Sequence, residues 1–345
     1  MIRFNNDYNR GAFDSVLRGL ADANTVSCPG YGEDEWCGRA ESVIKKLISS
    51  DDALIKFIPG ATQANIVVIA AALSSVQSVI AADTGHINCH EAASIENTGH
   101  KILELPNTEG KITAEQIAEC AAEYYDGGAP EHLTEPKLVY LSFPTEKGTL
   151  YSKRELKEIR TVCKKYGMYL FVDGARMGYG LGAESNDLTL KDFAQLTDVF
   201  YIGGTKGGAM FGEAVVILNG SLKEDFRYMI KQRGGMLAKG WLLGAQFSEL
   251  LRDGLYFRLA KKADEQAARI RDAFLEAGYP SYAQSPTNQQ FFILPGEVYE
   301  KLSEKYVFSR QETLQDGRVV IRICTSWATK DGDVEELITD VKNIK

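Results

Sequence analysis

The sequence predicts an α/β fold built on a mostly parallel, doubly wound sheet. Short apolar runs typical of buried strands alternate with segments of helical periodicity between residues 53 and 218. After residue 246 this alternation gives way to a long helical stretch and then to strands with antiparallel patterning. We therefore expect an N-terminal arm at 1–30, a large α/β domain at 31–245 and a smaller α+β C-terminal domain at 246–345.

The elements follow from the apolar periodicity and the turn residues that separate them. In the arm and the large domain we expect helices at 12–23, 35–49, 61–73, 113–124 and 152–166 and strands at 53–60, 102–105, 137–142, 169–173, 199–202 and 214–218, with a further strand and a short helix between 78 and 99. Beyond them we expect a basic helix at 223–231, a long helical stretch at 247–278 interrupted near Gly254, antiparallel strands at 289–295, 306–308 and 318–325, and a last helix at 332–342.

Composition narrows the class of protein and of partner. The chain has 345 residues, is 44% hydrophobic and carries a net charge of −8 with acidic and basic residues interspersed. That balance argues against nucleic acid or an anionic membrane as the main partner. No apolar run approaches the ~20 residues of a transmembrane helix, and the N-terminus has no signal-peptide core. Six scattered cysteines without a CxxC pair favour a reducing, cytoplasmic compartment.

The most informative stretch is DVFYIGGTKGG at 198–208, an apolar strand that leads into a glycine-rich turn. The turn carries one lysine, Lys206. Glycines let the backbone adopt positive φ and let a ligand approach closely. A buried lysine in such a turn is a candidate Schiff-base amine, because desolvation favours its nucleophilic neutral form. Taken alone, a solvated loop lysine is the simpler interpretation.

A second stretch, YLFVDGAR at 169–176, places Asp173 at the end of another apolar strand. Ligands of open α/β sheets bind at the carboxyl ends of strands. Pyridoxal phosphate needs a lysine for its Schiff base and an acid partner for its pyridinium nitrogen. Asp173 alone would suit a helix cap, but Asp173 and Lys206 in this order indicate a pyridoxal phosphate site.

Three further patterns bear on this site. The strand, small-residue turn and helix start at 53–65 predict a phosphate site at Gly60, Ala61 and Thr62, although most such junctions bind nothing. The stretch His86, Cys89, His90 resembles metal-ligand spacing, but HEAAS is not HExxH, so we expect no metal and a stacking or core role instead. GYGLGA at 178–183 imitates a dinucleotide fingerprint, but its context does not fit one.

The combined motifs resemble one family. The chain resembles the low-specificity L-threonine aldolases, within the fold type I pyridoxal phosphate enzymes related to aspartate aminotransferase and the β-eliminating lyases, nearly from end to end. The motifs that carry the resemblance are FNNDY at 4–8, YGED at 31–34, ATQAN at 61–65, DTGHI at 83–87 with Glu91, VDGAR at 172–176, GGTKGG at 203–208, GGM at 234–236 and RICT at 322–325.

The resemblance implies a role for individual residues. Lys206 would hold the cofactor and Asp173 would keep its ring nitrogen protonated. Gly60, Ala61 and Thr62, with Thr205, would bind the phosphate, and His86 would stack on the ring. Arg176 and Arg322 would clamp the carboxylate of the amino acid substrate, which would be cleaved to glycine and an aldehyde.

The resemblance also implies a homotetramer, a dimer of dimers with shared active sites. Tyr31, Lys231, Arg233 and Lys239 would then reach the site of a neighbouring subunit, and we favour Lys239 at the phosphate.

The chain departs from a better-known branch of the family at two positions. FPTEKG at 143–148 has Glu146 where that branch has an active-site histidine, and Asn6 stands where it has serine. The base that removes the β-hydroxyl proton therefore stays open among His86, Glu146 and a water held by them. Asn6 is expected to lie at the substrate carboxylate or hydroxyl.

Two alternatives remain at this point. Another fold type I enzyme, an aminotransferase or a β-eliminating lyase, would share the cofactor residues and differ only in its substrate pocket. A binding or scaffold protein without cofactor is disfavoured by Lys206 and Asp173. The sequence leaves open the preference between threonine and allo-threonine, the range of aldehydes, the physiological direction and a structural cation.

Overall fold

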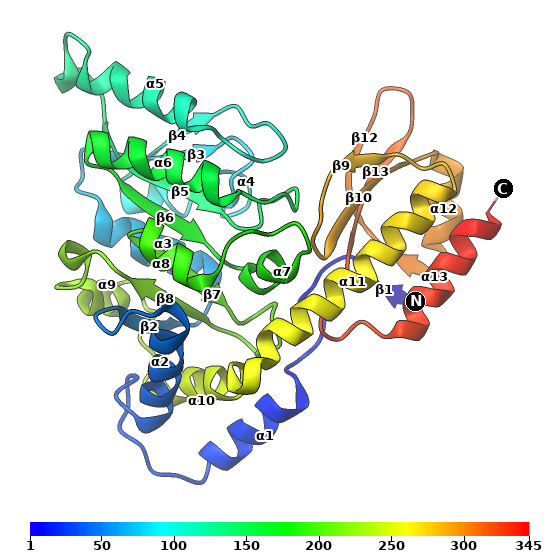
Figure 1. Ribbon diagram of the computed structural model, residues 1–345, viewed down its shortest axis with the longest axis horizontal. Helices are drawn as coiled ribbons and strands as arrows, with labels where there is room; N and C mark the ends of the chain where they lie inside the picture. Colours follow the sequence, from blue (N-terminus) through cyan, green and yellow to red (C-terminus); the bar gives the residue numbers. More distant parts are fainter. Residues whose placement is uncertain (345) are drawn as a thin grey trace.

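The structure, a computed structural model that describes residues 1–344, has a larger α/β lobe and a smaller C-terminal lobe (Figure 1). The long helix α11 (Leu255–Glu276) runs from one lobe into the other. This arrangement confirms the predicted fold class. The domain boundaries at residues 30 and 245 stay a prediction.

The larger lobe is organised around a seven-stranded sheet with the order β2-β8-β7-β6-β5-β3-β4. β3, β4, β5, β6 and β7 are mutually parallel, whereas β8 runs antiparallel to both of its neighbours. The strands are β2 (Leu54–Ile58), β3 (Gln77–Ala82), β4 (Lys101–Leu105), β5 (Glu135–Ser142), β6 (Tyr169–Asp173), β7 (Val199–Gly203) and β8 (Glu213–Ile217). Each predicted strand of this lobe is therefore present.

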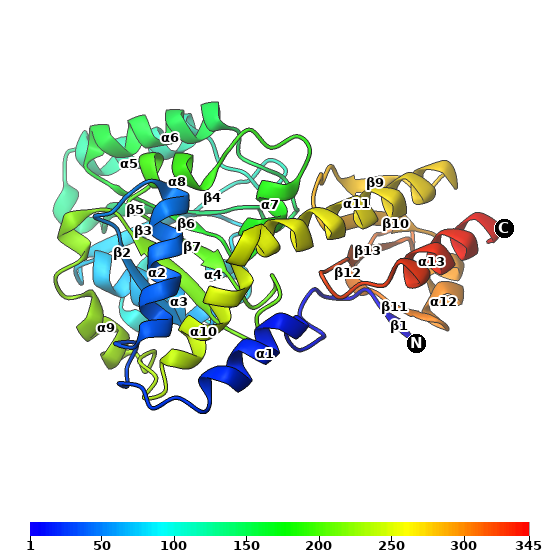
Figure 2. The same ribbon diagram turned by 60° about the horizontal axis from the view of Figure 1, so that its bottom comes forward.

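Helices cover both faces of this sheet (Figure 2). One face packs against α1 (Asp14–Ala23), α2 (Glu35–Ile48), α5 (Ala114–Tyr125), α6 (Lys153–Tyr166), α8 (Leu190–Leu196) and α10 (Trp241–Leu250). The other face packs against α3 (Ala61–Ala72), α4 (His86–Cys89) and α9 (Phe226–Gln232). Alternate residues of one strand enter the two cores: Phe200 faces the first set of helices and Tyr201 the second.

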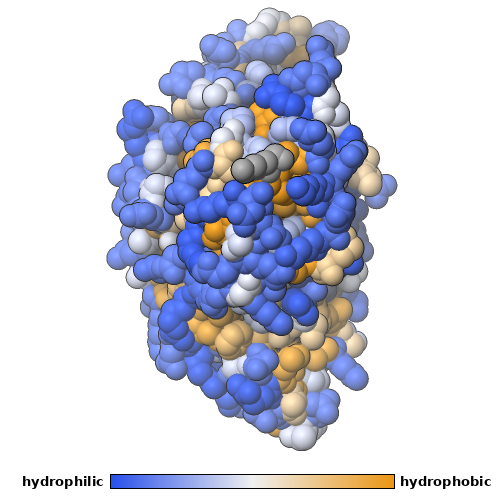
Figure 3. Space-filling model, turned by 90° about the vertical axis from the view of Figure 1, so that its right-hand side faces the viewer, coloured by the Kyte–Doolittle hydropathy of each residue, from blue (hydrophilic) through white to orange (hydrophobic). Residues whose placement is uncertain are grey.

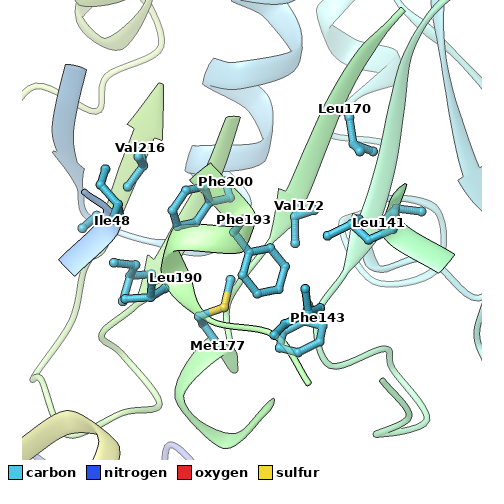
Figure 4. Packing of buried hydrophobic residues seen from close by; sticks show 14 of the residues in the cluster. Ile48, Leu141, Phe143, Leu170, Val172, Met177, Leu190, Phe193, Phe200 and Val216 are labelled. Carbon is cyan, nitrogen blue, oxygen red and sulfur yellow. The ribbon is translucent and has the colours of Figure 1, made fainter. Parts of the chain in front are cut away.

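The core on the first face is close-packed around aromatic side chains (Figure 4). Phe143 and Phe193 meet edge to face with ring centroids 4.8 Å apart, and Phe200 lies beside them. Burial of each such side chain contributes about 1.5–3 kcal/mol. This packing fixes the strands whose ends carry the candidate site residues.

The C-terminal lobe contains an antiparallel sheet with the order β12-β13-β10-β9. Its strands are β9 (Ser281–Ala283), β10 (Gln289–Leu294), β12 (Ser309–Thr313) and β13 (Val319–Cys324), and its other helices are α12 (Gly296–Ser303) and α13 (Asp331–Asn343). The predicted strand at 306–308 does not join this sheet. Instead β11 (Tyr306–Val307) pairs in parallel with β1 (Ile2–Arg3), because the apolar start of the arm is buried in this lobe.

Two helices close to the site lie outside the predicted set. α7 (Met177–Gly182) forms over the glycine-rich GYGLGA stretch, and α8 begins at a capping box formed by Thr189 and Asp192. Glycine has a low helix propensity, so the sequence of α7 did not indicate a helix. Both helices are also too short to show a clear apolar periodicity. Within residues 1–344, no helix combines the length and the apolar character needed to cross a membrane.

Candidate active site

The candidate site lies where the carboxyl ends of the parallel strands meet. β3, β5, β6 and β7 all end at this edge, and the residues that follow them converge on one pocket. The pocket is lined by Ala61, His86, Ser142, Pro144, Thr145, Glu146, Asp173, Ala175, Arg176 and Lys206. Six candidate residues are therefore brought together. Five of them follow the ends of four strands, and the sixth, Ala61, lies at the start of a helix.

Lys206 is held in a tight turn directly after β7. A side chain on Gly203 would place its Cβ 2.3 Å from the carbonyl oxygen of Ala175, so only glycine fits there. The Lys206 carbonyl accepts a hydrogen bond of 2.7 Å from the Tyr179 hydroxyl. Burial, aided by the nearby Arg176 charge, lowers the pKa of the Lys206 amine. A lysine with a lowered pKa has the character of a nucleophile.

Asp173 is a buried carboxylate at the end of β6. It accepts hydrogen bonds from the Tyr140 hydroxyl at 2.6 Å, the Asn65 amide at 3.1 Å and the backbone N–H of Ala175 at 3.0 Å. Burial raises its pKa, but the His86 charge and the Tyr140 hydrogen bond outweigh burial, and the net pKa is lowered. Asp173 is thus an anion aimed at the pocket.

His86 is oriented by Glu91, for which the sequence predicted no separate role. Its Nδ1 lies 2.7 Å from Glu91 Oε1, and the Glu91 side chain is fully buried. The ring of His90 meets His86 edge to face, with centroids 5.5 Å apart. His86 therefore has one nitrogen engaged with Glu91 and Nε2 left for the pocket.

Asn65 is a site residue to which the sequence analysis gave no role. Its side-chain amide donates to Glu91 at 2.7 Å and to Asp173 at 3.1 Å, so it joins the two carboxylates. The available signal was an amide side chain directly before the apolar run of helix α3, a place where an unpaired polar group is costly.

Glu146 lies in the turn after β5, half-buried beside His86. Its Oε1 accepts hydrogen bonds from the Ser142 hydroxyl at 2.6 Å and the backbone N–H of His86 at 2.9 Å. Burial raises the pKa of Glu146, against the hydrogen bond from Ser142. The direction of this shift, which the sequence left open, is upward.

The two candidate arginines differ in their partners. Arg176 forms a two-pronged ion pair with Asp7, with Nε 2.7 Å from Oδ2 and Nη2 3.1 Å from Oδ1. The edge of its guanidinium formed by Nε and Nη2 is therefore occupied before any substrate binds. Arg322 makes only long contacts, 3.3 Å to Gln289 Oε1 and 3.4 Å to the Asn5 carbonyl, and its buried Nε lacks a partner within residues 1–344.

The helix α3 begins at the same edge and presents free amides. Its N-cap residue Gly60 offers no side-chain cap, and a Cβ on Gly60 would meet open space. Ala61 lines the pocket and Thr62 is exposed. An uncapped helix start favours an anion.

Thr205, expected from the resemblance at the phosphate, is hydrogen-bonded within the chain. Its hydroxyl donates to Glu213 Oε1 at 2.7 Å, and its backbone N–H donates to the carbonyl of Gly212 at 3.2 Å. A threonine hydroxyl has one proton to give. In this structure the Thr205 hydroxyl proton is therefore given to Glu213, and the role of Thr205 at a phosphate stays a prediction.

Three other predicted site residues, Tyr31, Lys239 and Asn6, do not line this pocket. Tyr31 is 47% exposed with the Lys231 ammonium 4.9 Å from its ring centroid, and Lys239 is exposed. Asn6 Oδ1 accepts from the backbone N–H of Tyr8 at 3.1 Å, and its side chain lines a separate surface cavity with Arg10. None of these three residues lines the pocket around Lys206 in the described chain.

Comparison with known proteins identifies relatives over the whole chain. A family model described as β-eliminating lyase matches residues 19–295. The low specificity L-threonine aldolase of Pseudomonas aeruginosa is 31% identical, with 99% of this chain and 97% of the relative covered. A low specificity L-threonine aldolase of a second Pseudomonas strain is 30% identical, again over 99% of this chain and 97% of the relative.

Solved structures give the same result. The threonine aldolase of Leishmania major superposes with a TM-score of 0.97 and 42% identity over 99% of both chains. A putative L-allo-threonine aldolase of Listeria monocytogenes, 18% identical with a TM-score of 0.74 over 99% of this chain and 95% of that one, shares the fold.

Proposed function

This chain belongs to the β-eliminating lyase family and, within it, to the low-specificity L-threonine aldolases, and we propose that it cleaves L-threonine, L-allo-threonine and related β-hydroxy-α-amino acids to glycine and an aldehyde. The reaction is a retro-aldol cleavage of the Cα–Cβ bond that depends on pyridoxal phosphate. The observation that carries the proposal is the meeting of Lys206, Asp173, His86 and Glu146 around one pocket.

The residues present fit pyridoxal phosphate. The Lys206 amine has a lowered pKa, the Asp173 carboxylate is buried and anionic, and the open start of α3 offers amides to a phosphate. When bound, the cofactor supplies an electron sink for the electron pair of the broken Cα–Cβ bond. Lys206 would hold it covalently, and Asp173 would keep its ring nitrogen protonated.

The His86 ring would stack on the cofactor. Glu91 fixes the orientation of the imidazole through Nδ1, and Asn65 ties Glu91 to Asp173. The stacking residue and the ring-nitrogen partner are therefore held by one hydrogen-bonded network. Gly60, Ala61 and Thr62 would bind the phosphate from the start of α3.

The substrate carboxylate would bind at Arg322. Its weak contacts and unpartnered Nε fit a guanidinium that awaits a planar anion. Arg176 would contribute only the edge that Asp7 leaves free. Asn6 would assist from the arm, which Asp7 anchors beside Arg176.

Two groups are placed to accept the β-hydroxyl proton. Glu146 Oε1 is engaged by Ser142 and His86, so Oε2 is the atom that would take the proton. His86 Nε2 would take it directly or through a water. The raised pKa of Glu146 favours it as the base, because a carboxylate with a higher pKa accepts a proton more readily.

The active assembly would be a homotetramer with shared sites, in a reducing, cytoplasmic compartment. Apolar patches interrupt the hydrophilic surface on the face shown in Figure 3. Tyr8, Leu17, Val26 and Tyr31 are large exposed side chains of the arm and its continuation. Across such an interface Tyr31, Lys231, Arg233 and Lys239 would reach a neighbour's site, with Lys239 at its phosphate. All six cysteines are free thiols, which suits a reducing compartment.

Product analysis tests the function. The chain loaded with pyridoxal phosphate is incubated with threonine, allo-threonine and phenylserine, and glycine, aldehyde, ammonia and keto acid are measured. Equimolar glycine and aldehyde are expected. Release of ammonia together with a keto acid would instead identify a β-eliminating lyase. Transfer of the amino group to an added keto acid would identify an aminotransferase.

A further inference from the structure

Glu213 is a buried carboxyl at the edge of the candidate site to which no role has yet been given. It is the first residue of β8 and is 1% exposed. Because β8 runs antiparallel to β7, its first residue lies opposite Gly203, the last residue of β7. The strand direction therefore brings Glu213 to the edge where the parallel strands end.

Both carboxylate oxygens of Glu213 bind the turn that carries Lys206. Oε2 accepts from the backbone N–H of Gly204 at 3.1 Å, and Oε1 accepts from the Thr205 hydroxyl at 2.7 Å. The Thr205 hydroxyl also accepts from the backbone N–H of Gly212 at 3.0 Å. The two residues that directly precede Lys206 are thus fastened by one acid.

The negative charge of Glu213 is close to that of Asp173, and Lys206 supplies a positive charge nearby. Glu213 has no ion-pair partner within 4.0 Å in the described chain, and Asp173 is a second anion in its surroundings. Tyr201 and Tyr256 also face it and are neutral because burial raises the pKa of each hydroxyl. The positive charge of Lys206 acts on Glu213 and lowers its pKa, against the effect of burial.

Burial brings the pKa values of Glu213 and Lys206 closer together. It raises the pKa of Glu213 above its ordinary value, and it lowers the pKa of Lys206. Two such groups titrate as a coupled pair, because the protonation state of one changes the free energy of charging the other. An uncharged amine is the form that attacks the cofactor aldehyde.

We propose that Glu213 is a positioning residue, which fixes the Lys206 turn by its hydrogen bonds and sets the protonation state of the Lys206 amine by its charge. The proposal rests on the proposed function, since it assigns a task to the cofactor-binding lysine. It extends that function by naming the group that decides when this lysine is nucleophilic.

The test measures the lysine itself in the full chain freed of cofactor. Short pulses of acetic anhydride at a series of pH values label neutral amines, and peptide mass spectrometry gives the rate at each lysine. Loss of the Glu213 charge destabilises the ammonium form, so Glu213→Gln is expected to lower the labelling midpoint of Lys206 by about one pH unit. Exposed lysines in the same digest should keep their midpoints.

A second variant separates charge from fold. Glu213→Asp keeps the charge on a shorter side chain, so its Lys206 midpoint should lie with the wild type. An unchanged midpoint in Glu213→Gln would overturn the proposal, and so would a midpoint in Glu213→Asp that falls as far as in Glu213→Gln. If Glu213→Gln does not fold, the Asp variant still decides, since a lowered midpoint there contradicts a role for the charge.

A matched control is Glu41→Gln. Glu41 is also a partly buried acid with a raised pKa, but it lies on α2 beside Lys56. This variant should leave the Lys206 midpoint in place. The measurement needs no cofactor, so its result stands apart from the proposed function, whose failure would appear as cofactor attachment at another lysine.

Discussion

Asp7 and Arg176, 169 residues apart in the chain, form a buried ion pair with two hydrogen bonds of 2.7 and 3.1 Å. Asn288 at the start of the C-terminal sheet donates to the same carboxylate at 3.0 Å. The pair therefore joins the N-terminal arm, the large lobe and the C-terminal lobe at the wall of the candidate site. Burial raises the pKa of Asp7, but the Arg176 charge outweighs burial and lowers this pKa to about 2.

We expect Asp7→Asn to destabilise the protein by about 3–5 kcal/mol, because it leaves the Arg176 charge buried without its partner. Denaturant unfolding at pH 7 measures the effect. The folded pKa of Asp7 lies below its unfolded value, so its contribution is full above about pH 4 and is lost as the pH falls toward 2. The difference between wild type and variant should shrink over that window. Glu33→Gln, which breaks the exposed pair with Arg227, should cost less than about 1 kcal/mol.

Lys206→Ala should abolish covalent cofactor binding and nearly all turnover, because the variant has no amine at this position. In the wild type, borohydride reduction followed by peptide mapping should place the cofactor on Lys206. Lys223→Ala is the control and should keep the visible absorbance of the bound cofactor, because Lys223 is a half-buried lysine outside the pocket that donates to the carbonyl of Asp52. Reduction products on any other lysine would contradict the assignment.

Asp173→Asn should bind the cofactor and lose most activity. An amide keeps the size of the side chain but cannot hold the proton on the ring nitrogen. Cofactor absorbance and the rate of glycine release are measured on the same sample. Asn65→Asp would put a further negative charge between Asp173 and Glu91, and we expect it to weaken cofactor binding. Full activity in Asp173→Asn would exclude the proposed role.

Glu146→Gln should lower kcat/KM by about 10²-fold or more, because proton transfer by a placed base contributes at least that factor. Glu146 acts as a base only when ionised, so activity rises with pH through its pKa. Since burial raises that pKa above the ordinary 4.5, the ascending limb should lie at a higher pH than for a free glutamate and should vanish in the variant.

His86→Asn is the companion variant for the same question. If Glu146→Gln keeps near-full turnover and His86→Asn does not, His86 is the base and the assignment to Glu146 is wrong. Cofactor absorbance checks that both variants still bind pyridoxal phosphate.

Arg322→Lys should raise KM about tenfold or more, since a two-pronged carboxylate contact contributes roughly 1.5–3 kcal/mol and an ammonium cannot reproduce it. Initial rates over a range of threonine concentrations give KM and kcat separately. Arg318→Lys, in the exposed pair with Asp316, is the control and should leave both unchanged. An unchanged KM in Arg322→Lys would make Arg322 a structural residue.

Much of the candidate site was visible in the sequence because local pattern and chemistry agree there. The apolar run before Asp173 and the glycine turn around Lys206 each predict a strand end, and parallel strands end at one edge. The predicted helix at 152–166 is present as well, and it begins at a capping box formed by Ser152 and Glu155. The β1–β11 pair, in contrast, joins two very short strands from opposite ends of the chain, and no local pattern links them.

The sequence by itself determined the fold class, the family and the lysine, aspartate and histidine of the site, because strand periodicity and reactive side chains are local properties. Only the tertiary structure decided their partners. Arg176 is committed to Asp7, the Thr205 hydroxyl to Glu213, and the pKa of Glu146 moves upward rather than downward. Burial and contacts between distant segments set these outcomes, and the reversed direction of β8, which brings Glu213 to the lysine, is a property of the sheet as a whole.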